Sequence, residues 1–78
     1  MARLRLFGPA REAAGTALDE MPGATVTELL GVASQRYGSA FTVVLERSRI
    51  WVNGETADGD RRLVDGDEVA VLPPVSGG

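Results

Sequence analysis

The sequence contains no cysteine and no histidine, and these two absences remove most familiar catalytic and metal sites. Without cysteine there is no disulfide and no thiol chemistry. Without histidine as well, there is no common zinc site and no Ser-His-Asp triad. The Asp-Gly-Asp runs at 58–60 and 65–67 lack the spacing of a calcium loop, and the second is more simply a turn. We therefore expect no bound metal and no catalysis by this chain alone.

Lysine is also absent, because all eight cations are arginine. A phosphate-binding Walker loop and a Schiff base both need lysine, so the chain has neither. Arginine stays protonated and is a poor nucleophile, so no side-chain amine is available to attack the chain's own carboxyl end. The net charge of −3 argues against nucleic acid as a partner, since phosphates attract clustered cations.

Long apolar runs are missing from the 78 residues. Runs such as Val43-Val44-Leu45 are far shorter than the roughly 20 apolar residues that span a membrane, and the N-terminus lacks an apolar signal region. We therefore expect a cytoplasmic protein that does not engage a membrane. The balance of 44% hydrophobic and 24% charged residues is that of an ordinary globular chain. We expect a single domain over residues 1–72 and a functional tail over residues 73–78.

The N-terminal part of the chain predicts a strand pair. Alternation over residues 3–7 predicts a strand with its leucines inward and Phe7 outward. Gly8-Pro9 ends this strand and begins a loop. Residues 16–21 then predict the second strand of a hairpin, although their alternation is poor.

The clearest pattern is that of a helix over residues 25–38. Thr25 and Glu28 fit a capping box at its start, and the apolar residues that follow share one face at a spacing of 3.6. Gly38 supplies a left-handed stop. Residues 39–47 suit either a helical turn or a strand, and we favour a short helix.

The C-terminal part predicts strands again. Residues 49–52 alternate before the turn pair Asn53-Gly54 and place Trp51 outward. A short strand at Leu63-Val64 and a last strand over residues 68–72 follow, and the last strand runs directly into the tail. This order of elements predicts an α+β roll in which one main helix crosses a mixed sheet of four to five strands.

The last six residues form a carboxyl end suited to chemistry. Pro73 and Pro74 favour extended geometry, so the tail reaches roughly 20 Å from the domain at about 3.3–3.6 Å a residue. Gly77 and Gly78 have no Cβ, which would let a narrow channel in a partner bring a catalytic group close to the terminal carbonyl. The alternative interpretation is a frayed terminus.

The run Asp65 to Gly78, Asp-Gly-Asp-Glu-Val-Ala-Val-Leu-Pro-Pro-Val-Ser-Gly-Gly, resembles the end of the small subunit of molybdopterin synthase. Residues 6–15 are similar to that family's first strand and loop, and residues 52–55 to the end of its third strand. The tail motif is specific to sulfur carriers of the ubiquitin-like β-grasp fold. Its Pro-Pro-Val form favours the molybdopterin branch over the thiamine branch. Residues 39–48 match nothing diagnostic.

The resemblance implies a β-grasp fold and a chemistry for Gly78. In this family an ATP-dependent activating enzyme adenylates the terminal glycine, and a sulfur donor converts the adenylate to a thiocarboxylate. The tail enters the large subunit of molybdopterin synthase, where the thiocarboxylate gives sulfur to the pterin precursor. The chain is then a recycled co-substrate with no bound cofactor. The partner-binding tail comprises Pro73, Pro74, Val75, Ser76 and Gly77.

An exposed apolar face is expected to dock the partner. If the first and last strands are neighbours, outward Phe7 and Leu72 form an apolar patch with Trp51. In the family the positions matching Phe7, Arg11 and Leu72 lie at the partner interface, and Arg11 would pair with a carboxylate there. The alternative is that Phe7 and Leu72 merely cover the sheet edge and Arg11 is a solvated charge.

Other functions of the same tail remain open at this point. A carrier that supplies sulfur for thiamine, cysteine or a secondary metabolite needs the same glycines and another acceptor. A ubiquitin-like modifier would join Gly78 to a lysine of another protein. A β-grasp module that only binds a partner would not need Gly77 and Gly78 at all.

Overall fold

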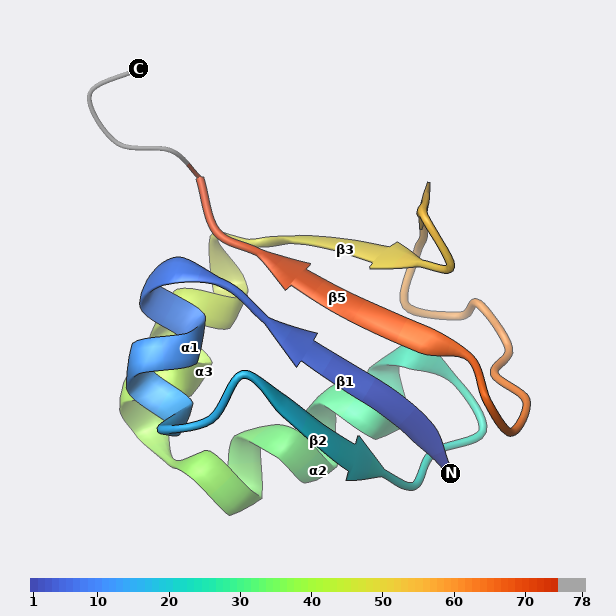
Figure 1. The fold of residues 1–78 in the computed structure, drawn as a ribbon, viewed down its shortest axis with the longest axis horizontal. Coiled ribbons are helices and arrows are strands. Elements are labelled where there is room, and N and C mark those ends of the chain that lie inside the picture. The colour runs from blue at the N-terminus through green and yellow to red at the C-terminus, as the bar shows by residue number, and fades with distance from the viewer. Residues whose placement is uncertain (75–78) are drawn as a thin grey trace.

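The computed structural model describes residues 1–74, and these form a five-stranded sheet with three helices. The strand order is β2-β1-β5-β3-β4, and the helices lie against one face of the sheet (Figure 1). The predicted α+β roll with a mixed sheet is confirmed. In chain order the elements are β1 (Ala2–Leu6), α1 (Gly8–Ala14), β2 (Leu18–Met21), α2 (Val26–Tyr37), α3 (Ser39–Glu46), β3 (Arg49–Val52), β4 (Glu55–Thr56) and β5 (Glu68–Leu72).

The first and last strands pair in parallel at the centre of the sheet. In this pairing Leu4 lies opposite Val69 and Leu6 lies opposite Val71. Antiparallel β2 flanks β1, and antiparallel β3 flanks β5. Parallel neighbours need a long crossover, and here the chain between β1 and β5 supplies the three helices and the other three strands.

Alternation along the central strands decides which side chains form the core. Leu4, Leu6, Val69 and Val71 point to the helical face, and each is at most 1% exposed. The helices contribute the opposite side of the core through their apolar faces. The other large side chains that are completely buried are Phe41, Met21, Leu29, Val26 and Val52.

Helix α2 begins as predicted at a cap. The Thr25 hydroxyl accepts the backbone N–H of Glu28 at 3.2 Å, and the Glu28 carboxylate accepts the N–H of Ala24 at 3.4 Å. Gly38 ends the helix with φ 95° and ψ −173°. This conformation is essentially restricted to glycine, but it is not the left-handed helical one that was predicted. The predicted short helix that follows is confirmed as α3.

The loop predicted after Gly8-Pro9 is wrong, because a short helix, α1, occupies residues 8–14. Phe7 is its N-cap, and Pro9 lies in the first turn, where the missing N–H has no helical partner in any case. Gly15 closes the helix in the left-handed conformation, and its N–H donates to the Arg11 carbonyl at 2.9 Å.

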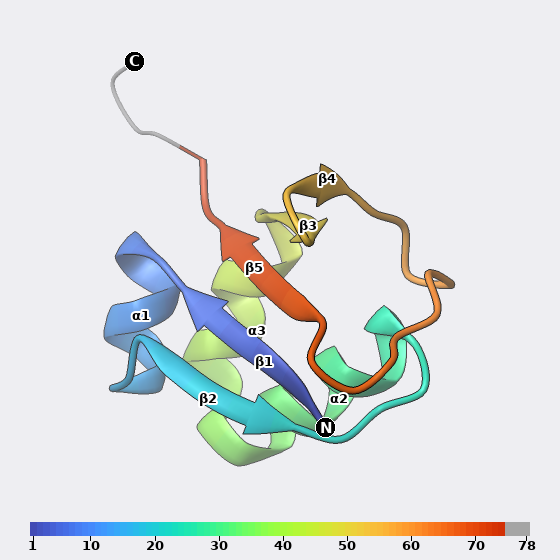
Figure 2. The same cartoon turned by 45° about the vertical axis from the view of Figure 1, so that its right-hand side comes forward.

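The short strand was also predicted in the wrong place. Asn53 and Gly54, with φ 51° and 84°, turn the chain so that β4 pairs with β3 (Figure 2). Leu63 and Val64 belong to no strand. The Leu63 N–H donates to the Ala24 carbonyl at 2.9 Å, and this bond ties the long loop to the chain just before α2.

The turn at residues 65–67 forms as predicted. Gly66 has φ 89°, and the Asp67 carboxylate accepts the Val64 N–H at 2.9 Å and the Asn53 side-chain amide at 2.9 Å. These bonds hold the pKa of Asp67 below its usual range, the Val64 bond being the larger cause. In the part of the chain that the structure describes, no helix is both long and apolar enough for a membrane crossing.

A polar cluster joins the end of α2 to strand β2. The Tyr37 hydroxyl donates to the Asp19 carboxylate at 2.5 Å, and Arg36 donates to the same oxygen at 3.2 Å. The Tyr37 bond is the largest of the effects that lower the pKa of Asp19. Burial, and after it the hydrogen bond to Asp19, raises the pKa of Tyr37 to about 12, so its hydroxyl remains a donor at neutral pH. The Tyr37 ring also meets Phe41 edge to face at 5.1 Å.

Replacing Tyr37 with Phe removes the hydroxyl and keeps the ring. We expect the free energy of unfolding at pH 7 to fall by about 1 to 2 kcal/mol, because a hydrogen bond to a charged group contributes about 1.5–3 kcal/mol and water screens part of this one. Urea denaturation of Tyr37→Phe and the natural chain measures the difference.

The same pair of proteins tests the pH dependence. Because folding lowers the pKa of Asp19, its contribution is complete above the unfolded value of about 3.9 and is lost as the pH falls through the folded value. The difference between Tyr37→Phe and the natural chain should therefore shrink in acid. An equal difference at pH 7 and well below pH 3.9 would contradict this assignment.

Candidate functional site

The tail starts at the end of the central strand β5. At this end Leu6 lies opposite Val71, and Arg49 lies opposite Leu72. Pro73 is half-buried and Pro74 is exposed. Two neighbouring strands therefore hold the last residues of β5, directly before the tail. The predicted working residues Val75, Ser76, Gly77 and Gly78 lie outside the described residues, and their roles remain predictions.

The face of the sheet away from the helices carries a row of side chains across four strands. Trp51 lies opposite Ala70, Ala70 lies beside Arg5, and Arg5 lies opposite Leu18. Leu72 is on the same face as Ala70, since it is two residues further along β5. Trp51, Ala70 and Leu72 are each half-buried. An apolar strip thus runs from the middle of this face to the start of the tail.

Phe7 lies at the same end of the sheet as Leu72. It directly follows Leu6, the partner of Val71, and 41% of its surface is exposed. Phe7 is the N-cap of α1 and not a residue of the first strand. The register therefore places Trp51 and Leu72 on one face of the sheet and Phe7 at the end of the sheet where Leu72 lies. The predicted role of these three residues at an interface remains a prediction.

Arg11 comes from a different element. It is exposed on helix α1, which packs against α3, and it is not part of the row across the sheet. Among residues 1–74 no carboxylate forms an ion pair with it. Its predicted role at an interface remains a prediction.

One ion pair borders the apolar strip. Arg5 donates through Nε to the Glu68 carboxylate at 2.9 Å, across the central parallel pair. The two side chains are 42% and 35% exposed, so water screens their attraction. The pair keeps two opposite charges close together beside Ala70 and Trp51.

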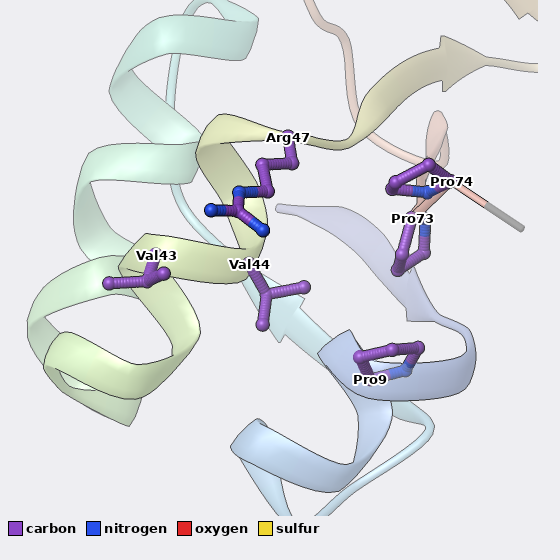
Figure 3. A pocket seen from close by; sticks show the side chains of 6 residues that line it. All are labelled: Pro9, Val43, Val44, Arg47, Pro73 and Pro74. Atoms are coloured by element: carbon purple, nitrogen blue, oxygen red, sulfur yellow. The ribbon is translucent and has the colours of Figure 1, made fainter. Parts of the chain in front are cut away.

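A groove on the helical side of the tail was missed by the sequence analysis. It has a volume of about 170 Å³ and lies where the tail passes the start of α1 and the end of α3 (Figure 3). No local sequence pattern marks it, because Val43 and Arg47 meet Pro9 and the prolines of the tail only in the folded chain. The residues that line it are Pro9, Val43, Val44, Arg47, Pro73 and Pro74.

The described residues contain no buried polar or charged side chain. Over residues 1–74, acidic side chains also nowhere gather in a group of three that would hold a metal ion. The chemically distinctive features of this part of the molecule are thus on its surface, at the open face and around the start of the tail.

Comparisons with known proteins show which family and which solved structures this chain is similar to. A family model described as the ThiS family matches residues 4–78. Small archaeal modifier protein 1 from Methanosarcina acetivorans is 31% identical, with a TM-score of 0.84 over 99% of this chain and 95% of that chain. A putative molybdopterin converting factor subunit 1 from Pyrococcus furiosus is 30% identical, with a TM-score of 0.81 over 95% and 97%.

A third solved structure contains two different proteins. In the protein-protein complex of subunits 1 and 2 of the molybdopterin-converting factor from Helicobacter pylori 26695, one chain is 26% identical to this one. Its TM-score is 0.75, over 99% of this chain and 97% of that chain. No curated protein gives a significant match. The predicted β-grasp fold of ubiquitin-like sulfur carriers is confirmed by these similarities.

Replacing Glu68 with Gln breaks the ion pair with Arg5 and leaves the side chain's shape unchanged. We expect the free energy of unfolding to change by about 0.5 kcal/mol or less, because both partners are exposed to water. Urea denaturation with Glu55→Gln as the control measures this, since Glu55 is 77% exposed and 3.9 Å from Arg61. A loss of unfolding free energy several times larger than that of the control would show that the ion pair stabilises the pairing of the central strands.

Proposed function

This chain belongs to the ThiS family, and we propose that it carries sulfur as a thiocarboxylate on Gly78. The observation that carries the proposal is the extent of the family match, which continues through the final glycine. The structure supports it because the tail follows directly on β5, a central strand of the sheet. A fixed attachment point suits a carrier, whose reactive end must be presented to two enzymes in turn.

The chemistry begins with activation of the tail. A terminal carboxylate has a pKa of about 3.3–3.7, so at neutral pH it is ionised and a poor electrophile. An activating enzyme would join it to the AMP part of ATP and release pyrophosphate. A sulfur donor then displaces AMP, and one carboxyl oxygen is replaced by sulfur. When the sulfur is passed on, an oxygen from water restores the carboxylate.

The acceptor that we propose is the pterin precursor of the molybdenum cofactor. The similarity to a putative molybdopterin converting factor subunit from Pyrococcus furiosus supports this choice, as does the Pro-Pro-Val tail. The Helicobacter pylori structure is a complex of subunits 1 and 2, which supports a large subunit as the partner. The chain would act in the cytoplasm as a co-substrate of these enzymes and bind no cofactor itself.

Protein modification is the second candidate function. It is favoured by the similarity to small archaeal modifier protein 1, which at 31% identity is as strong as the similarity to the converting factor. In this role Gly78 would form an amide with a lysine of another protein. This chain has no lysine, so the modified side chain would belong to a different protein.

The open face of the sheet is the proposed docking surface for the large subunit. Phe7, Trp51 and Leu72 offer adjoining apolar side chains beside the start of the tail. Apolar patches of this kind mark interaction sites on soluble proteins. Arg11, which is exposed on α1, would pair with a carboxylate at the margin of the same interface.

The carrier proposal predicts a change in the intact mass of the chain recovered from its own cells. A gain that matches the replacement of one oxygen by sulfur should appear, and deletion of Gly78 should abolish it. Higher-mass conjugates that contain this chain, with no such gain in the free chain, would favour the modifier instead. An unmodified chain in cells that make the molybdenum cofactor would contradict the proposal.

Replacing Leu72 with Asp tests the docking surface. Burying a new carboxylate in an apolar interface is costly, so affinity for the large subunit should fall by about tenfold or more. Calorimetry measures the affinity, and circular dichroism checks that the chain still folds. Val64→Asp is the matched control, because Val64 is 68% exposed and lies in the loop before β5. Equal affinities for Leu72→Asp and the natural chain would exclude this surface.

A further inference from the structure

The groove beside the tail has features of a second binding surface. Three of its residues are prolines, and two are valines of α3. Figure 3 shows Val44 pointing from α3 into the space that Pro9 and Pro73 face from the other side. Proline rings have little freedom to lose, so a partner that fills this space pays a small entropic cost.

Val43 lines this groove but does not pack against the hydrophobic core. It is 55% exposed, whereas its neighbour Val44 packs against the core. Thr42, Val43 and Val44 follow one another in α3, yet only Val43 directs a large apolar side chain to solvent. A partner that covered Val43 would remove this surface from water, which is favourable.

Arg47 gives the groove a charge. It caps the C-terminal end of α3 and is exposed. Within residues 1–74 it forms no ion pair, while Arg5, Arg36 and Arg61 each have a carboxylate partner. A guanidinium beside an apolar groove favours an occupant that combines an apolar side chain with a carboxylate, since it binds carboxylates in a defined geometry.

The position of the groove indicates which protein supplies that occupant. Pro73 and Pro74 are at once a wall of the groove and the first residues of the tail. The groove therefore adjoins the point at which a partner would take up the tail. The groove lies on the helical side of the tail, and the strip of Trp51 and Leu72 lies on the open face of the sheet, so the two surfaces flank the tail's first residues.

We infer that this groove receives an apolar side chain flanked by a carboxylate from the large subunit that accepts the tail. The inference rests on the proposed function and adds a second contact to it. The partner then holds the start of the tail from both sides, with the open sheet face on one side and α3 on the other. Such a grip would orient Pro73 and Pro74 before the glycines reach the active site.

Val43→Asp and Arg47→Glu test the inference in the full chain with the large subunit of molybdopterin synthase. Each should weaken binding about tenfold or more in calorimetry, because each places a negative charge against the partner's carboxylate. Val64→Asp and Arg62→Glu make the same chemical changes in the loop at the other end of β5 and should stay close to the natural affinity. Raising the salt concentration should weaken binding of the natural chain more than that of Arg47→Gln.

Intact mass, measured after incubation with the activating enzyme, ATP and a sulfur source, separates the two proposals. If Val43→Asp and Arg47→Glu still gain sulfur and bind the large subunit with normal affinity, the proposed role of the groove is wrong and the carrier function is unaffected. Failure of the natural chain both to gain sulfur and to bind would overturn both. An effect on self-association alone, seen by sedimentation, would assign the groove to a second copy. If Val43→Asp unfolds, Val43→Gln removes the apolar contact without adding a charge and should still weaken binding.

Discussion

The structure depends on the parallel pairing of its first and last strands. Leu4 and Leu6 of β1 lie opposite Val69 and Val71 of β5, and all four are buried in the core. This contact joins the two ends of the domain at the centre of the sheet, with β2 paired to β1 on one side and β3 paired to β5 on the other. Because Pro73 and Pro74 follow directly on β5, the first residues of the tail are attached to the buried centre of the sheet.

This anchor links stability to function through geometry. A tail that left from an edge strand or a loose loop would swing over many directions, and each ordered residue would cost entropy on binding. Here β1 and β3 flank the last residues of β5, which fixes the point and the direction in which Pro73 and Pro74 leave the sheet. The surfaces around this point are available for partners, because the described residues place their apolar core on the helical side and leave the other face of the sheet open.

The elements that sequence analysis predicted are those with a long or regular pattern. Strand β5 alternates and α2 has both a cap and a periodic face, so each was found close to its observed limits. Helix α1 was missed because Gly8-Pro9 is typical of a turn, and its small alanines give no amphipathic signal. The two-residue β4 has no pattern of its own. For the site, parity placed Trp51 and Leu72 correctly on the open face, whereas the groove depends on α3 meeting the tail in space, which no local pattern encodes.

The central claim is that the domain is a scaffold and that the terminal glycines carry the chemistry. The most direct test is reconstituted sulfur transfer by a chain that lacks Gly77 and Gly78, with its free energy of unfolding measured alongside. The account predicts unchanged stability and complete loss of sulfur transfer to the pterin precursor. Retention of activity without the two glycines would contradict it and would identify the chain as a module that only binds its partner.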